Sequence, residues 1–380
     1  MLASKPKREH TTQDILQELY QPCEESFCNG GFGSDSFGNV VLGSTQVADF
    51  GADYSVDCGV DFGADSCVNL PKMPNIHPKR TSTLIQSPLN YTGSKFRLLP
   101  QILPLFPKGI STMVDLFCGG ASVGVNVSAK YIVLNDRLKE LVKILALLKC
   151  ENVESLLAQI ESIITDFHLS DSAKFGYKFY HCDSAKGLSS YNKAGFLALK
   201  NAYNNDKDTL KLFVLIIYAF NNQIRFNSKG EFNLPCGKRD FNAKMQQKLK
   251  DFVQAMQSKN ISLQSKDFRE FDSGILDKQS LVYIDPPYLL ANAGYNENGG
   301  WSEEDEKDLL DFMTFLDSRG VRFAFSNVLF HKGREHKILA TWLKSNPKFH
   351  THFLDFSYKN CNYQTKRAES SEVLVVNFKV

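Results

Sequence analysis

The sequence predicts an α/β protein with a doubly wound, Rossmann-like sheet and an inserted, mainly helical subdomain. After residue 79, short apolar runs alternate with segments of helical periodicity, a pattern typical of strands and of helices that cover both faces of a parallel sheet. Between residues 150 and 241 helical patterning dominates. With 380 residues, 43% of them hydrophobic, the chain can bury one large core or two moderate cores.

Each expected element follows from a local pattern. Apolar runs of strand length predict the central strands, and amphipathic spacing predicts the helices between them. The sheet would be built from residues 80–149 and 242–380, with residues 150–241 as the insertion. The expected strands are centred on Val114, Val133, Leu263, Val282 and Phe323, with two more at 353–358 and 373–378, and the expected helices cover 137–149, 242–257, 302–318 and 332–344.

The first 79 residues are predicted to be a disordered, acidic appendage. They hold 5 Lys and Arg against 11 Asp and Glu, a net charge of −6, which leaves 39 against 31 and a net charge of +8 on the remaining body. The sequence at 49–53 recurs at 61–65 within a region rich in Gly, Ser and Asp. Two copies are too few to stack as a solenoid, and little aliphatic material is available for a core. Residues 11–20 could form one short amphipathic helix.

Charge and cysteine content restrict the class of protein. A basic body behind an acidic tail is compatible with a nucleic-acid partner. Nine cysteines occur without a C-x-x-C pair, which predicts reduced thiols, no metal site and a cytoplasmic protein. The most apolar stretch, 210–220, is too short to span a membrane and is expected to be a core helix.

A strand, a glycine turn and a helix are predicted in succession. Asp115 closes the strand, Phe117 follows it, and Gly119 and Gly120 allow the backbone to approach a ligand. The glycines do not match the G-x-G-x-x-G spacing of dinucleotide sites, and an acid at the strand end repels pyrophosphate and attracts a cation. The next strand ends in Asp136, where an acid can accept ribose hydroxyls. Together these features predict adenosyl binding; a turn made only for packing is the alternative.

The most specific motif is Asp285-Pro286-Pro287-Tyr288, which follows the apolar run 281–284. It therefore lies at the carboxyl end of a strand, where open α/β sheets place ligands. The prolines stiffen the backbone, so the Asp285 carboxylate and the Pro286 carbonyl can act as two acceptors beside an aromatic ring. Two acceptors and a stacking ring suit the exocyclic amino group of a planar base. An ordinary strand end with a proline-rich turn is the alternative.

A basic hairpin is predicted between the two halves of the sheet. Asn-Ser-Lys-Gly at 227–230, between two alternating runs, is a hairpin signal. Arginine can pair with guanine, lysine can hold phosphates and aromatic rings can wedge between bases, so the hairpin is a candidate groove reader. Its phenylalanines could instead form a hairpin core, which we favour for Phe232. The candidate DNA-binding residues are Phe220, Asn221, Arg225, Lys229, Pro235, Lys238 and Arg239.

The order of these motifs resembles that of the Dam-like DNA N6-adenine methyltransferases, the D12 class, over residues 82–380. The resemblance rests on the glycine turn after Asp115, the sequence at 90–95, the strand that ends at 267–268 and the motif at 285–288. It implies a methyltransferase fold with a C-terminal hairpin and S-adenosylmethionine as cofactor. It also implies methyl transfer to N6 of an adenine flipped out of duplex DNA. A cytosine N4 methyltransferase, an enzyme acting on RNA and an inactive DNA-binding module are the alternatives.

The resemblance assigns roles to single residues around the cofactor. Tyr91 would flank it and Lys95 would meet its methionine carboxylate, unless Lys95 is a solvated surface lysine. Asp267 would bind the adenine amino group and Phe268 would stack on the adenine, unless Asp267 only caps the turn that follows. The sequence at 325–327 would lie beside the target pocket or form a plain strand-end turn.

For DNA, the resemblance implies that Arg225 reads a guanine and that Phe220 and Asn221 fill the space left by the flipped base. The site would contain GAT, although members that read GATC often carry lysine where this chain has Asn90. The protein would be the modification component of a restriction-modification system, with a cognate endonuclease that shares its site and need not contact it. It would act in a prokaryotic or phage-infected cell, with the nucleoid. The polar segment 359–367 would face DNA or form a surface loop.

Overall fold

The computed structural model describes residues 84–91, 93–291, 300–355 and 370–380, all of which belong to one compact unit. Their strands form one mixed sheet in the order β3-β2-β1-β4-β5-β8-β7, with β6 paired to β5. Neighbouring strands are parallel from β3 to β5, whereas β8 is antiparallel to both β5 and β7. The strands are β1 (Ile110–Asp115), β2 (Ala129–Asn135), β3 (Ile261–Gln264), β4 (Leu281–Ile284), β5 (Arg322–His331), β6 (Arg334–Glu335), β7 (His350–Leu354) and β8 (Ser370–Val376).

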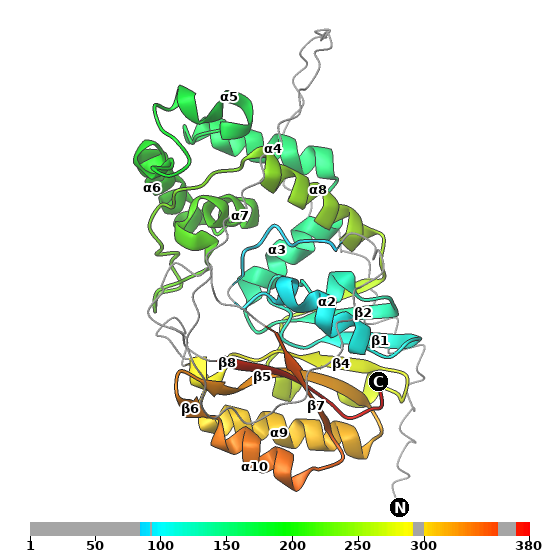
Figure 1. The fold of residues 1–380 in the computed structure, drawn as a ribbon. Coiled ribbons are helices and arrows are strands. Elements are labelled where there is room, and N and C mark those ends of the chain that lie inside the picture. Colours follow the sequence, from blue (N-terminus) through cyan, green and yellow to red (C-terminus); the bar gives the residue numbers. More distant parts are fainter. Residues whose placement is uncertain (1–83, 92, 292–299, 356–369) are drawn as a thin grey trace, which may run out of the picture. The chain divides into compact units, whose positions relative to one another are not determined.

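Helices cover both faces of this sheet, which confirms the predicted doubly wound α/β fold (Figure 1). Helices α9 and α10 pack on one face, α3 and α8 lie on the other, and α4, α6 and α7 extend from that second side. The helices are α2 (Leu99–Ile102), α3 (Lys139–Cys150), α4 (Val153–Asp166), α5 (Ser172–Phe179), α6 (Ser189–Asp206), α7 (Thr209–Tyr218), α8 (Ala243–Gln257), α9 (Glu303–Ser318) and α10 (Lys337–Ser345).

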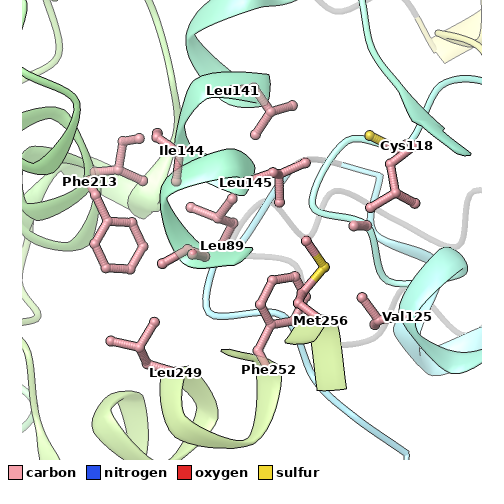
Figure 2. Close-up of a cluster of buried hydrophobic side chains, with 14 of the residues drawn as sticks. Leu89, Cys118, Val125, Leu141, Ile144, Leu145, Phe213, Leu249, Phe252 and Met256 are labelled. Atoms are coloured by element: carbon pink, nitrogen blue, oxygen red, sulfur yellow. The ribbon is translucent and has the colours of Figure 1, made fainter. Parts of the chain in front are cut away.

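Alternate residues of the strands enter two separate cores. Met113 of β1 joins the cluster formed with α3, α7 and α8, whereas its neighbour Val114 joins the cluster formed with α9. This alternation follows from the two-residue period of a strand, and it fixes the register because a one-residue slip would exchange the faces. Figure 2 shows part of the first cluster, in which Leu145 of α3, Phe213 of α7 and Phe252 of α8 lie close together.

Most predicted helices are confirmed to within about two residues, as expected for boundaries set by capping. Asn242 caps α8 and Ser302 caps α9, the latter in a capping box with Asp305. The helix expected at 332–344 begins later, at Lys337. The preceding residues form a turn between β5 and β6, with Gly333 at φ +79°, and His336 caps α10.

The prediction of a helix after the glycine turn is wrong. Only a 3-10 turn, Gly124–Asn126, lies between β1 and β2. Glycine and valine dominate this segment and have low helix propensity. Asn126 instead closes a compact loop, because its side-chain amide donates to the carbonyls of Ser122 and Ile85, at 2.8 Å each.

The terminal hairpin of β7 and β8 begins earlier than predicted, at His350 and Ser370. The appendage 1–79, the segment 359–367 and the last residues of the expected strand 353–358 lie outside the described residues. Among the described cysteines, Cys118, Cys182 and Cys236 are free. In the described part of the chain, no helix is long and apolar enough to cross a membrane, and no cluster of ligands that could hold a metal ion is found.

Candidate active site

The sheet topology brings two carboxylates to one point. The chain leaves β1 toward β2 and β3 and then returns to β4 on the other side of β1. Such a switch point opens a crevice at the carboxyl ends of the two strands. Asp115 ends β1 opposite Tyr283 of β4, and Asp285 follows β4 directly. Two motifs far apart in the sequence therefore share one site.

Lys95 lies at the centre of this site. Its Nζ is 2.8 Å from Asp285 Oδ1 and 3.8 Å from Glu372 Oε1, and it donates to the Gly93 carbonyl at 3.0 Å. It also lies 4.8 Å from the centre of the Tyr288 ring, within range of a cation–π interaction. The side chain is only 5% exposed, so Lys95 is not a solvated surface lysine. In this structure it is the counter-ion of the Asp285 carboxylate.

Asp285 keeps hydrogen-bonding capacity. Its buried Oδ1 is 2.8 Å from Lys95 Nζ, an ion pair whose angles lie outside hydrogen-bond geometry, and it accepts no hydrogen bond from another described residue. Buried acceptors are almost always satisfied in native structures, and exceptions mark places where a ligand can bind. Burial raises the pKa of Asp285, and Lys95 partly opposes that shift. The carboxylate is thus desolvated and ready to accept a hydrogen bond.

Glu372, which was not among the predicted site residues, completes the group. It lies on β8 with its side chain 5% exposed, and its Oε1 accepts a hydrogen bond from the Tyr288 hydroxyl at 2.9 Å. This bond ties the Tyr288 ring to the sheet. One sequence feature does point to Glu372: it is an acid within the apolar run of β8, and a buried acid is expected to have a hydrogen-bond or ion-pair partner. In addition, the Tyr283 hydroxyl of β4 and Ser326 Oγ of β5 lie 2.8 Å apart and form a hydrogen bond that joins the two strands.

Asp115 is held by the loop that follows it. Its Oδ2 accepts a hydrogen bond from the backbone N–H of Gly124 at 2.9 Å. Burial raises the pKa of Asp115 to about 7, and the nearby Asp285 adds to the increase. A buried carboxylate with so high a pKa gains most from a cationic ligand, which would favour its ionised form.

The glycine turn requires glycine because Tyr91 covers it. Gly119 has φ +48°, and a Cβ there would lie 2.8 Å from the Tyr91 ring. The backbone N–H of Gly119 donates to Asp136 Oδ2 at 2.9 Å, and Leu138 N–H donates to the other carboxylate oxygen. Asp136 thus lies beside the turn, as its predicted role requires, and each of its oxygens can accept a further bond.

Phe117 and Phe268 come together at the same edge of the sheet, with ring centres 5.8 Å apart. Phe117 is half-buried, whereas Phe268 is buried. Asp267 caps its own turn, since Oδ1 accepts from the Arg269 backbone N–H at 3.0 Å. The same oxygen pairs with the Arg269 guanidinium, which stacks on Phe268. Capping uses Oδ1 and leaves Oδ2 able to accept a hydrogen bond, so the contact of Asp267 with the adenine stays a prediction.

The predicted hairpin forms as a short loop rather than as regular strands. Phe226 and Phe232 make an isolated antiparallel bridge, and Asn227 N–H donates to the Glu231 carbonyl at 2.9 Å. Phe232 is buried and part of the core. The Arg225 guanidinium is oriented by Asn233, whose side-chain oxygen accepts from Nε at 2.8 Å. Exposed positions hold the other candidate DNA contacts, namely Phe220, Asn221, Lys229, Pro235, Lys238 and Arg239.

A basic pocket of about 370 Å³ lies beside the hairpin. Its cations are Arg239, Lys244 and Lys248, and none of these forms an ion pair with another described residue. Burial lowers the pKa of Lys248, and the neighbouring Lys244 lowers it further. The one acid of the lining, Asp240, is occupied by hydrogen bonds from Ser170 and Ser172. The pocket therefore presents net positive charge. Asn90, Asn222, Asn242 and Met245 complete its lining.

The sheet order and the site at its switch point define a methyltransferase-type α/β fold. Residues 91–366 match the model of the D12 class N6 adenine-specific DNA methyltransferase family. The chain belongs to this family, which confirms the resemblance seen in the motifs.

Three relatives show how far the similarity extends. The chain is 41% identical over 305 residues to the type II methyltransferase M.FokI of Planomicrobium okeanokoites and 36% identical over 310 residues to the modification methylase StsI of Streptococcus sanguinis. These alignments cover 79% and 80% of this chain but 44% of each relative, so the chain spans less than half the length of either. The DNA adenine methylase of Escherichia coli (strain K12) is 24% identical over 247 residues, which cover 63% of this chain and 79% of that protein.

Proposed function

We propose that this chain transfers a methyl group from S-adenosylmethionine to N6 of an adenine flipped out of duplex DNA. The carrying observation is the buried Asp285 carboxylate, which is ion-paired with Lys95 outside hydrogen-bond geometry and lies next to the Tyr288 ring, one strand away from Asp115. The names of the relatives M.FokI and StsI, a methyltransferase and a modification methylase, support this activity.

The described residues fit this cofactor. Tyr91, the turn at Gly119 and Gly120, Asp136 and Phe117 surround the carboxyl end of β1, where they would hold an adenosyl group. The Asp115 carboxylate, with its raised pKa, suits the cationic part of the molecule. When bound, the cofactor supplies an activated methyl group, so the protein needs no nucleophile of its own.

The residues of the chain would then position the target amino group relative to the methyl donor. Asp285 and the Pro286 carbonyl would accept its two hydrogens, which leaves the nitrogen lone pair localised and pointing away from them. The Tyr288 ring, fixed through Glu372, would stack on the base. Holding the two reactants in line accounts for much of the rate. Asp285 need not remove a proton first, because the product cation loses its proton readily.

The site would contain GAT, and the protein would be the modification component of a restriction-modification system with a cognate endonuclease. The relatives' names support the system, and the position of Arg225 supports the guanine contact. Action on DNA in a prokaryotic cell follows from the same proposal. Single-molecule methylation sequencing of a plasmid treated with the protein tests the site: modified adenines outside any common GAT core would overturn it.

The pH dependence of cofactor affinity gives one prediction. The ionised form of Asp115 attracts a cation, and its pKa of about 7 means that the fraction ionised falls as pH drops. Affinity for S-adenosylmethionine, measured by calorimetry without DNA, should therefore fall toward tenfold per pH unit below about pH 7. In the protein without ligand, the free energy of unfolding depends on pH with the opposite sign. A carboxyl group whose pKa is raised by folding stabilises the protein at low pH, and this stabilisation is lost as pH rises through 7. Asp115→Asn should flatten both profiles; unchanged profiles would contradict the assignment.

A second prediction separates the base reader from the phosphate contacts. Arg225→Ala should lose about 1–3 kcal/mol of discrimination at one base pair, because a guanidinium oriented by Asn233 can pair with one base edge. Lys238→Ala should weaken all sequences alike and reduce the salt slope of binding by about one, as expected for a phosphate contact. Methylation rates on single-base site variants at two salt concentrations measure both. A uniform loss for Arg225→Ala with altered site preference for Lys238→Ala would reverse the assignments.

A further inference from the structure

A buried polar network lies under the cofactor side of the site. The Glu306 carboxylate of α9 has no exposed surface, and it receives hydrogen bonds from Trp301 Nε1 to Oε2 at 2.6 Å and from Asn327 Nδ2 to Oε1 at 3.1 Å. His336 Nε2 lies 3.2 Å from Oε1. A buried carboxylate is retained only where its hydrogen bonds serve some purpose, because its desolvation is costly.

Two contacts orient the His336 ring. Its Nδ1 accepts a hydrogen bond from the Leu339 backbone N–H at 3.2 Å, which orients the ring so that Nε2 is the nitrogen on the side of Glu306. The carboxylate thus accepts hydrogen bonds from Trp301 before α9 and from Asn327 on β5, while His336 before α10 lies 3.2 Å from it without forming a hydrogen bond. This arrangement holds the Trp301 indole in one orientation.

Trp301 contacts two of the predicted cofactor residues, Phe117 and Phe268. Its ring packs edge-on against Phe117, with ring centres 5.8 Å apart, and in a tilted arrangement against Phe268, with ring centres 5.9 Å apart. The three rings form an aromatic wall, in which Trp301 is only 7% exposed. Phe117 is the half-buried member and so the one with surface left for a ligand. A shift of the indole would change the position of both phenylalanines.

We propose that Trp301, anchored by Glu306, is a positioning residue that sets the aromatic wall on which the adenine ring of the cofactor binds. This inference rests on the proposed use of S-adenosylmethionine and adds two residues to the site, neither of which was predicted from the sequence. Glu306 acts only through Trp301.

The chain offers a direct probe because it contains two tryptophans, Trp301 and Trp342. Trp342 packs against Phe349 and donates to Thr314, in the layer of α9 and α10. In the Trp342→Phe protein, emission therefore reports Trp301 alone. Titration with S-adenosylhomocysteine should change this emission with the same Kd that calorimetry gives. The matched Trp301→Phe protein, which keeps Trp342, should show no change in emission.

Glu306→Gln tests the anchor. It should raise the KM for S-adenosylmethionine and the Kd for S-adenosylhomocysteine about tenfold, with kcat within about threefold, because a charge-assisted bond to Trp301 becomes a neutral one. Trp301→Phe, which keeps a ring but loses the donor, should act in the same direction if Glu306→Gln fails to fold. Binding seen by calorimetry without a change in Trp301 emission overturns the inference, as does an unchanged Kd in both variants. Absence of any binding would instead overturn the proposed function, and the inference with it.

Discussion

Asp285→Asn should lower kcat for DNA methylation by about 10²–10³-fold. The substitution keeps the size of the side chain but replaces the ionised acceptor that would hold the target amino group. The cofactor residues Tyr91, Asp115 and Asp136 have their own hydrogen bonds and packing and should remain in place. The affinity for S-adenosylhomocysteine should therefore change by less than about threefold, a value within ordinary mutational scatter.

The measurement is single-turnover methylation together with calorimetric cofactor binding. Asp251→Asn, on the exposed face of α8, is the matched control and should behave like the wild type. If Asp285→Asn retained wild-type turnover, the acceptor role would be wrong; a parallel loss of cofactor affinity would place Asp285 in the cofactor site instead.

Lys95→Met should reduce the free energy of unfolding by about 3–5 kcal/mol near neutral pH, the usual cost of removing one partner of a buried ion pair. Lys95 faces Asp285 and Glu372, both buried, and its loss would leave their charges uncompensated. The deficit should depend on pH. Burial already raises the pKa of Asp285, and without the lysine the carboxyl would bind its proton more tightly. The deficit should therefore be small below about pH 4, where unfolded carboxyls are protonated, and grow as pH rises.

Urea unfolding at several pH values measures this deficit. Lys95→Met combined with Asp285→Asn should recover part of the lost stability, since the unpaired charge is removed as well. Lys174→Met is the matched surface control: its partner Glu161 is 3.2 Å away, but both side chains are 59% exposed, and less than about 1 kcal/mol should be lost. Equal losses in the two single variants would show that Lys95 has no special role in the buried site.

The sequence predicts the fold well where the pattern is local. The central strands alternate between two faces, and capping residues such as Ser302 and Asn242 mark where helices begin. The failures lie where tertiary contacts override local pattern. The segment after Gly120 has a turn instead of a helix, because Asn126 binds the distant Ile85 and Asp115 binds Gly124.

In the candidate site, too, the sequence does not predict contacts between residues from distant elements. The motif order places Asp115 and Asp285 at adjacent strand ends, because the topology of a doubly wound sheet follows from it. Glu372 and Glu306 could not be placed in this way, since their partners come from distant elements. Lys95 was assigned to the cofactor carboxylate by resemblance. Its position against Asp285 depends on how the segment before β1 packs, and no pattern in the sequence encodes that contact.

The reaction that we propose for this chain is the transfer of a methyl group to the amino nitrogen of adenine in duplex DNA. Its most direct test is incubation of unmethylated duplex DNA with the protein and deuterium-labelled S-adenosylmethionine, followed by mass spectrometry of the nucleosides. We expect labelled N6-methyldeoxyadenosine, which should form about 10²–10³-fold more slowly with Asp285→Asn. Labelled N4-methyldeoxycytidine, label in RNA alone, or no label in a protein that binds the cofactor would contradict it.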